Sequence, residues 1–282
     1  MSTPKPTFVR EVARIDNPEF VPGQAAGHSA RRLIDAPDAA FADPFVLMAE
    51  DWTSQGAFAS HPHRGIETVT YVIEGSIEHR DNAGYEGVIR AGGVQWMTAG
   101  RGIQHEENPP AGTRAHTLQL WVNLPAAEKM AVPRYQDLMA SVLPVWSEDG
   151  VEVRIFSGAY ADRVSTTLNH HPVTMLEVQV ENGGAFRHSF AATDNAFVYV
   201  LEGEVEIGPA DDLLEASQLG WLTRSEELGS SELTITARGN AVRFLLFAGQ
   251  PLREPIAFGG PFVMNTQAEI QQAFADFRAG RF

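Results

Sequence analysis

The sequence predicts an all-β protein made of β-sandwiches or β-barrels, and three observations support this. Short β-like runs recur along the 282 residues, Gly or Asn turns separate them, and the chain contains 25 Gly and 17 Pro. Such a Gly and Pro content favours turns over long helices, and repeated short strands are typical of a sandwich or barrel. With 44% hydrophobic and 20% charged residues, the chain can bury a sizeable core.

The chain begins with an arm and then becomes regularly β-like. Residues 1–45 mix Pro, Gly and Asp with short apolar pieces such as Phe8-Val9 and Val12-Ala13, which predicts one or two edge strands packed on the body. A first domain is expected over residues 46–143. The strands predicted for this part of the chain are Phe45–Met48, Glu67–Ile73, Gly87–Ile89, Gln95–Met97 and Leu118–Val122.

Two helical segments are predicted. Leu124–Leu143 has helix-start features and is interrupted by Pro133, so we expect a broken helical connector at the end of the first domain. Near the C-terminus, Thr266 and Glu269 form a capping-box pattern. The helix that follows is expected to close a second, β-rich domain over residues 144–282. Its apolar stripe at helical spacing is Ile270, Ala273, Phe274 and Phe277.

An internal repeat connects the two β-rich regions. Tyr71–Glu78 resembles Tyr199–Glu206, since each reads as an apolar strand, a Glu-Gly turn and a second strand. Two copies of one β-barrel unit are therefore expected.

Charge and composition exclude several classes of function. The formal net charge is -15 and the arginines near the N-terminus are scattered, so direct nucleic-acid binding is not expected. The N-terminal residues lack the apolar core of a secretory signal, and no apolar run approaches the ~18 residues of a membrane span. We therefore expect a cytoplasmic protein without membrane contact. Cysteine is absent, so any metal must be held by His and carboxylate.

The segment from His61 to Tyr71 is the first candidate for chemistry. His61 and His63 lie two residues apart at the head of an alternating run. If Pro62 does not break the pleat, both imidazoles leave the same face of one strand. Two converging imidazoles are half of a metal site. At the offset of the repeat, the second copy carries Ser189 and Ala191 at these places, with His188 one residue out of register.

The candidate second half of the site is His105 with Glu107, which again share one strand face. Gly100 and Gly102 suit a tight turn just before them. Glu67 is a competing carboxylate because it has the same strand parity as the first histidine pair, and spacing does not rank it against Glu107. Three imidazoles and one carboxylate suit divalent iron, manganese, nickel, copper or zinc.

Five segments closely resemble the pirin family of the cupin superfamily, and the similarity extends from about Asp43 to Phe277. Segments this long are highly specific. They are His61–Tyr71, Gln95–Ile103, Leu118–Leu124, Gln250–Pro255 and Gly260–Asn265.

The resemblance implies a bicupin, with two jelly-roll-like β-barrels face to face, a metal in the N-terminal barrel and a degenerate C-terminal barrel. It implies that iron is bound, with manganese, nickel, copper, zinc or cobalt as alternatives. The implied ligands are His61, His63, His105 and Glu107, which leaves Glu67 outside the ligand set. Ser60 stands where pirins often carry Asp, a difference expected to alter the surroundings of the site.

The activity implied by the resemblance is that of a quercetin 2,3-dioxygenase, which opens a flavonol ring with O2 and releases carbon monoxide. Glu107 would then take the proton of the flavonol 3-hydroxyl. Some pirins are linked instead to transcriptional regulation or to binding a metabolic enzyme, so the alternative is a metal- or redox-responsive protein-interaction module without turnover. Another metal-dependent cupin enzyme, such as an isomerase, is a third hypothesis.

Several residues near these motifs have two interpretations. Trp96, Met97 and Trp121 either line a flavonol pocket or fill the core. Arg64 and Arg101 either steer an anionic substrate or pair with a nearby carboxylate, Glu67 or Glu106. The other histidines are expected to be surface or hydrogen-bonded residues: His28, His79, His116, His170, His171 and His188.

Overall fold

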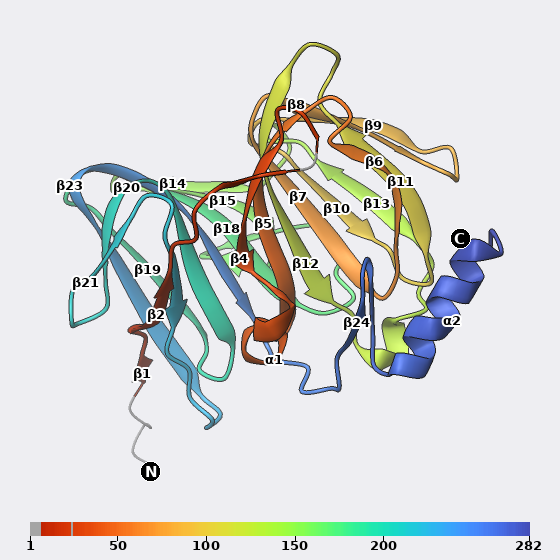
Figure 1. Cartoon of the computed structure of the whole chain (residues 1–282). Helices are drawn as coiled ribbons and strands as arrows, with labels where there is room; N and C mark the ends of the chain where they lie inside the picture. Colours follow the sequence, from red (N-terminus) through yellow and green to blue (C-terminus); the bar gives the residue numbers. More distant parts are fainter. Residues whose placement is uncertain (1–6, 24) are drawn as a thin grey trace. The chain divides into compact units, whose positions relative to one another are not determined.

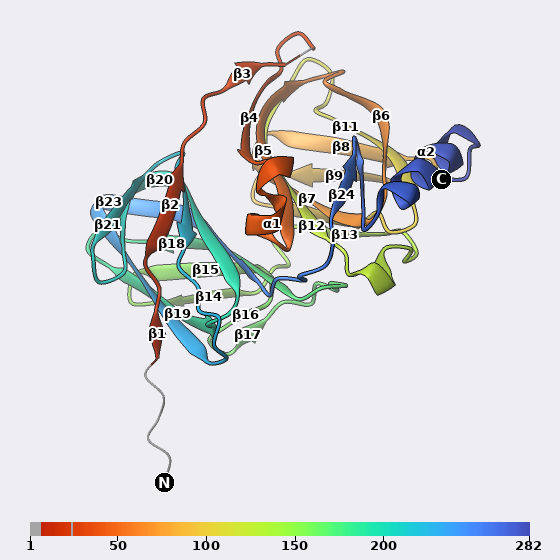
Figure 2. The same ribbon diagram turned by 60° about the horizontal axis from the view of Figure 1, so that its bottom comes forward.

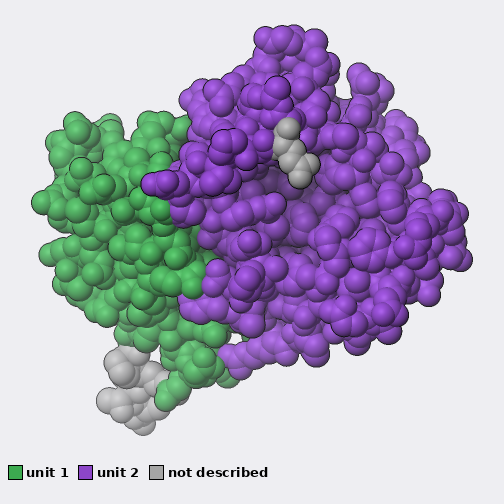
Figure 3. All heavy atoms as spheres, viewed as in Figure 1, with its two compact units in different colours: residues 1–17, 143–251 green, residues 18–142, 252–282 purple. Residues whose placement is uncertain are grey.

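The computed structural model describes residues 7–23 and 25–282 and divides the chain into two compact units (Figure 3). Unit 1 contains residues 1–17 and 143–251, and unit 2 contains residues 18–142 and 252–282. The first six residues of the expected arm lie outside the described residues. Both units are built from β-strands with few helical turns (Figure 1), as the sequence predicts.

Unit 1 contains a ten-stranded sheet with the central order β14-β15-β18-β23-β20-β22-β2. Strands β20 and β23 are long enough to pair with several neighbours, and β1, β19 and β21 extend the sheet from them. The strands of unit 1 are β1 (Phe8–Val9), β2 (Val12–Asp16), β14 (Val145–Glu148), β15 (Val151–Ser157), β16 (Ala159–Tyr160), β17 (Arg163–Val164), β18 (Val173–Val180), β19 (Ala185–Ala191), β20 (Asn195–Ile207), β21 (Asp212–Glu215), β22 (Leu219–Leu222) and β23 (Ser230–Gly249).

Unit 2 contains a seven-stranded sheet, β13-β10-β7-β12-β5-β4-β3, and a four-stranded sheet, β6-β11-β8-β9. Figure 2 shows β6, β11, β8 and β9 in the same part of the unit. The strands are β3 (Val21–Pro22), β4 (Ser29–Ile34), β5 (Phe45–Ser54), β6 (Phe58–His63), β7 (Ile66–Glu74), β8 (Ser76–Asp81), β9 (Glu86–Arg90), β10 (Val94–Thr98), β11 (Ile103–Asn108), β12 (Arg114–Asn123), β13 (Arg134–Leu138), β24 (Ala257–Gly259) and β25 (Phe262–Met264); the helices are η1 (Ala36–Asp38), α1 (Ala39–Ala42), η2 (Ala126–Glu128) and α2 (Gln267–Arg278).

The strand predictions are confirmed, since every run expected between residues 45 and 123 lies in a strand. Several of these runs lie in strands that are buried along most of their length, whereas other strands of unit 2 alternate between buried and exposed residues. In β8, for example, Ile77 and His79 are buried while their neighbours Glu78 and Arg80 are exposed, which is the period of two that a pleated strand imposes.

The predicted helical connector is wrong for most of its length. A single 3-10 turn, Ala126–Glu128, forms at its start. Beyond Pro133 the chain becomes β13, in which Arg134–Leu138 pairs with Val94–Thr98 of β10. Pro133 stops the helical turns, and an available sheet edge satisfies the backbone of the following residues better than a short isolated helix would.

The predicted domain boundaries also differ from the structure. The arm does not belong to one body, because β1 and β2 pair with β23 and β22 of unit 1, whereas β3 and β4 belong to unit 2. The capping box of Thr266 and Glu269 is confirmed, but α2 packs on β24 and β25 of unit 2 rather than closing the second β-rich domain. No helix in the described ranges is long and apolar enough to span a membrane.

Candidate metal centre

Strand β6 brings His61 and His63 to the same face, as the sequence predicts. Pro62 lies within the strand and leaves its pairing with β11 intact, with His61 opposite His105. The ring centroids of His61 and His63 are 4.9 Å apart. An i, i+2 spacing on a pleated strand is therefore sufficient to bring the two imidazoles together.

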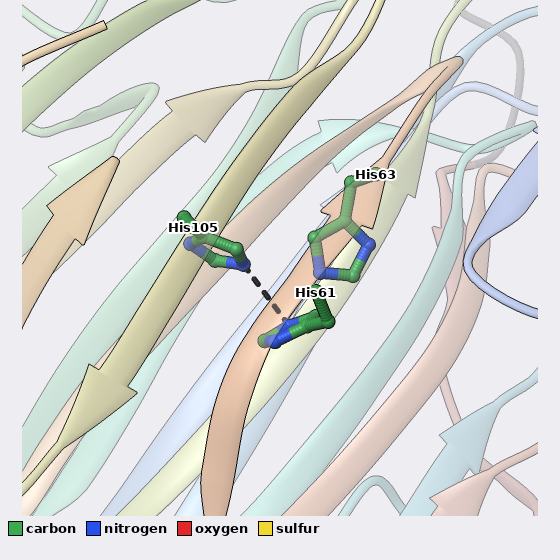
Figure 4. Close-up of side chains that lie close together, drawn as sticks. All are labelled: His61, His63 and His105. Atoms are coloured by element: carbon green, nitrogen blue, oxygen red, sulfur yellow. Dashed lines mark hydrogen bonds between the residues drawn. The ribbon is translucent and has the colours of Figure 1, made fainter. Parts of the chain in front are cut away.

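His105 of β11 joins this pair to form a three-histidine cluster (Figure 4). One ring nitrogen from each of the three residues lies within 4.8 Å of the others, and His105 Nε2 is 3.1 Å from His61 Nε2. His63 is 1% exposed, and its ring nitrogens have no side-chain hydrogen-bond partner among the described residues. Buried polar atoms are normally satisfied, and a bound divalent cation would satisfy one of these nitrogens.

The electrostatics of the cluster favour the metal-binding form of each buried ring. Burial lowers the pKa of His63 to about 3, and the neighbouring His61 adds to the effect. Burial also lowers the pKa of His105 well below its usual value, with contributions from the nearby histidines. Since a neutral imidazole is the form that binds metal, these two rings need no deprotonation at neutral pH.

His79 is a site residue that the sequence interpretation did not single out. Its Nε2 lies 2.5 Å from His105 Nδ1, and it is 1% exposed. Because this contact occupies Nδ1, the Nε2 atom of His105 is the one that faces His61. The buried alternation of β8, in which His79 shares a face with Ile77, is the signal that could have identified it.

Glu107 lies beside His105 and His79, and its carboxylate forms a second group with these two residues, which shares His105 with the three-histidine cluster. It is 4% exposed. Thr70 Oγ1 donates to Oε1 at 3.0 Å, and Gln119 Nε2 donates to Oε2 at 2.8 Å. Two donors to one buried carboxylate fix its orientation.

The turn before β11 depends on glycine, as expected. Gly100 and Gly102 both have positive φ, of 49° and 134°, a region that favours glycine. A Cβ on Gly100 would lie 2.1 Å from the carbonyl oxygen of Ala131. Glycine therefore lets the chain pass close to a neighbouring segment immediately before His105.

Two of the remaining candidates, Glu67 and Arg64, form hydrogen bonds with residues outside the three-histidine cluster. Glu67 is fully buried and accepts a hydrogen bond of 2.7 Å from Thr98 Oγ1. Arg64 donates to Asp276 at 2.8 Å and to the carbonyl of Arg101 at 2.6 Å. Arg64 therefore pairs with a carboxylate, as one of its two interpretations expected, but α2 supplies that carboxylate in place of Glu67.

Arg101 is exposed, and Glu106 forms its ion pair with Arg80 at 4.0 Å instead. The pairing expected between Arg101 and Glu106 is therefore replaced by a contact across β11 and β8, whose strands place Glu106 opposite Arg80.

A cavity of about 740 Å³ opens beside the cluster, and His61, His63 and Trp121 contribute to its wall. The Trp121 ring lies 5.1 Å from that of His63 in a T-shaped arrangement. Trp96 and Met97 do not line this cavity. Both are at most 1% exposed, and Met97 packs in the hydrophobic core of unit 2, so the core interpretation holds for them.

Strand pairing shows which residues of unit 1 correspond to the site residues of unit 2. The residue that follows each copy of the repeat is His79 in unit 2 and Ile207 in unit 1. His79 pairs with Glu107, and Ile207 pairs with Ile235. Ile235 therefore stands in unit 1 where Glu107 stands in unit 2.

His105 and Leu233, which lie two positions before Glu107 and Ile235, correspond to each other in the same way. His105 pairs with His61, and Leu233 pairs with His188. His188 is therefore the counterpart of His61, and the next inward residue of β19, Phe190, is the counterpart of His63. The assignment of Ser189 and Ala191 to these places, which follows from a constant offset, is wrong by one residue.

Two cupin-like β-units, one of which carries a buried histidine cluster, define a two-domain cupin protein with a candidate site for a divalent metal. The Pirin family model matches residues 31–122, and the model of the Pirin C-terminal cupin domain matches residues 175–282. The chain belongs to the pirin family.

Individual relatives agree with this assignment. The chain is 38% identical to a pirin-like protein of Solanum lycopersicum, over 99% of this chain and 94% of the relative. Among solved structures, it is similar to a protein from Geobacillus kaustophilus at 40% identity and a TM-score of 0.85, over 88% of this chain and 99% of that one. It is also similar to a quercetin 2,3-dioxygenase from Acinetobacter baumannii at 32% identity and a TM-score of 0.85, over 97% and 98% of the two chains.

Proposed function

We propose that this protein is a metal-dependent quercetin 2,3-dioxygenase that opens the flavonol ring with O2 and releases carbon monoxide. The observation that supports the proposal most strongly is the three-histidine cluster on the wall of a cavity of about 740 Å³. Sites for small molecules usually have volumes of ~300–1,000 Å³, so a flavonol fits. The likeness to a quercetin 2,3-dioxygenase along nearly the whole chain adds support.

In this proposal His61, His63, His105 and Glu107 hold the metal, and iron is the ion. When bound, the metal would act as a Lewis acid toward the flavonol 3-oxygen and would supply the chemistry with O2. The three imidazoles provide neutral nitrogen ligands, and Glu107 provides a negative charge. The same carboxylate is assigned to take the 3-hydroxyl proton of the flavonol.

Two further side chains connect Glu107 with the cavity. Gln119 lines the cavity and donates to Glu107 Oε2, while Trp121 Nε1 donates to Gln119 Oε1 at 3.1 Å. Trp121 also contributes an apolar face to the wall beside His63. These residues orient the carboxylate and exclude water from the place where a planar ligand would lie.

The test is incubation of the metal-loaded protein with quercetin, with and without O2, while the loss of flavonol absorbance and the release of carbon monoxide are followed. We expect turnover only with O2, and the highest kcat/KM with iron when iron, manganese, nickel, copper, zinc and cobalt are compared. Full metal occupancy without turnover would contradict the proposal and favour the non-catalytic, metal-responsive interaction module.

A further inference from the structure

The same cavity has a second polar group on its wall, formed by His28 and Asp51. His28 directly precedes β4, and Asp51 lies in β5. His28 Nε2 lies 2.8 Å from Asp51 Oδ1, and the two side chains are 14% and 7% exposed. The pair is therefore held in a defined geometry at the edge of the cavity and is separate from the residues assigned to the metal.

An aromatic ring links the pair to the histidine cluster. Phe58 makes a T-shaped contact with His28, with 5.3 Å between ring centroids, and its centroid lies 6.4 Å from that of His61. All three residues line the cavity. The wall thus presents imidazole nitrogens at His61, an apolar ring at Phe58, and a polar pair beyond it.

The placement of Asp51 is unusual for a residue with only a structural role. Along β5 it shares strand parity with Leu47 and Ala49, which also line the cavity. Burial raises the pKa of Asp51, and the hydrogen bond with His28 opposes this rise. His28 occupies one carboxylate oxygen, and a carboxylate accepts hydrogen bonds on both. Arg32 also lines the cavity and acts on the charge of Asp51. A buried carboxylate next to apolar wall residues such as Leu47 and Ala49 is the kind of group that fixes the orientation of a ligand.

We propose that the His28–Asp51 pair binds a hydroxyl group of an aromatic ligand, on a ring remote from the oxygen that faces the histidine cluster. The cavity then selects planar aromatic compounds that carry such a hydroxyl over analogues that lack it. A phenol donates to Asp51, whose second partner, His28, holds the carboxylate in place. The inference rests on the proposed function, because it takes the histidine cluster as the anchor for the other end of the ligand.

The test compares quercetin with 3-hydroxyflavone, which has the same ring system but no hydroxyl beyond the 3-position. Dissociation constants are measured on the metal-loaded full-length protein without O2, by quenching of tryptophan fluorescence. We expect the native protein to bind quercetin at least about tenfold more tightly, since an analogue without the hydroxyl leaves one oxygen of the buried carboxylate without a hydrogen bond. Asp51→Asn should reduce this ratio to within about threefold while leaving the affinity for 3-hydroxyflavone unchanged.

Two further variants separate recognition from a structural effect. His28→Gln keeps a side-chain N–H donor for Asp51 and should preserve the ratio, whereas His28→Leu should lower it as Asp51→Asn does. Glu86→Gln, which changes a 74% exposed carboxylate of the same unit, is the control and should behave like the native protein. Thermal unfolding of each variant verifies folding, and His28→Leu replaces Asp51→Asn if the latter does not fold.

The possible failures are distinguishable. Binding of both flavonols with equal affinity by the native protein, or an unchanged ratio in Asp51→Asn and His28→Leu, overturns the role of the pair and leaves the proposed function standing. Absence of binding by both compounds overturns the proposed function and this inference together.

Discussion

Unit 2 and unit 1 use equivalent strand positions in opposite ways. In unit 2 the inward positions of β6, β8 and β11 carry His61, His63, His79, His105 and Glu107. In unit 1 the equivalent positions carry His188, Phe190, Ile207, Leu233 and Ile235. One histidine is retained in unit 1, and apolar residues occupy the other four positions.

The difference shows that the candidate site requires several side chains that converge on one point, and that a single histidine is not sufficient. His188 is surrounded by aromatic rings, with centroids of Tyr160, Phe186 and Phe190 at 5.4, 6.1 and 5.6 Å. Burial lowers its pKa to about 4, so it packs as a neutral ring. A single imidazole without converging partners does not provide the ligand set that a metal requires.

The largest effect is expected from removing two cluster residues. His61→Ala combined with His105→Ala should reduce metal content from one ion per chain to nearly none, because one imidazole is left. His188→Ala, which removes the counterpart in unit 1, should leave metal content unchanged. Elemental analysis of protein purified without added metal measures both, and full occupancy in the double variant would rule out the cluster as the site.

Lowering the pH should distinguish the two units in the metal-free protein. Unit 2 buries His63, His79 and His105, and unit 1 partly buries His188, all with lowered pKa values. The unfolded chain takes up protons below pH ~6.5 while a folded ring with a pKa of about 3 does not. Stability therefore falls as the pH drops from ~6.5 toward 3, by about 2 kcal/mol at pH 5 for such a ring.

The measurement is urea denaturation at pH 7 and pH 5, with hydrogen exchange used to resolve the units. Unit 2 should lose more stability than unit 1, and His188→Phe should remove most of the loss in unit 1. Equal losses in the two units would contradict the assignment of three buried neutral rings to unit 2.

Replacing His79 by its counterpart in unit 1 should weaken metal binding. His79→Ile removes the hydrogen-bond partner of His105 Nδ1, and loss of such an outer partner typically costs 10–100-fold in metal affinity. His79→Gln, which can still hydrogen-bond, should recover part of the loss. Competition with a chelator of known affinity measures the effect, and native affinity in His79→Ile would show that His105 needs no orienting partner.

The smallest effect is expected at the helix that the structure places in unit 2. Thr266→Ala removes the side-chain oxygen that accepts from the Glu269 amide at 3.2 Å. Loss of such a cap typically costs about 1 kcal/mol. Hydrogen exchange should show the loss in unit 2, with unit 1 unaffected. A loss confined to unit 1 would contradict the packing of α2 on β24 and β25.

Part of the candidate site could be predicted because strand parity is a local property. The spacing of His61 with His63, and of His105 with Glu107, fixed which side chains share a face before any pairing was known. The location of Glu107 beside His79 could not be predicted in this way. It depends on which residue of β8 lies opposite it, and a one-residue change in register would have turned Glu107 to the other face.

The same reasoning applies to Arg64. Its neighbours in the sequence offered Glu67 as a partner, but its carboxylate comes from Asp276, 212 residues later in the chain. Contacts of this range depend on where α2 docks. The capping box predicted that helix without indicating the surface on which it would pack.

The sequence by itself determined the all-β class, the predicted strands between residues 45 and 123, the capped last helix and the histidine pairs, because these follow from local alternation, turn residues and spacing. Only the tertiary structure decided that β1 and β2 pair in unit 1, that α2 packs in unit 2, that β13 replaces a helix, and that His28 and Asp51 share a cavity with His61. These outcomes depend on strand register and long-range packing, which bring together residues that no local pattern connects.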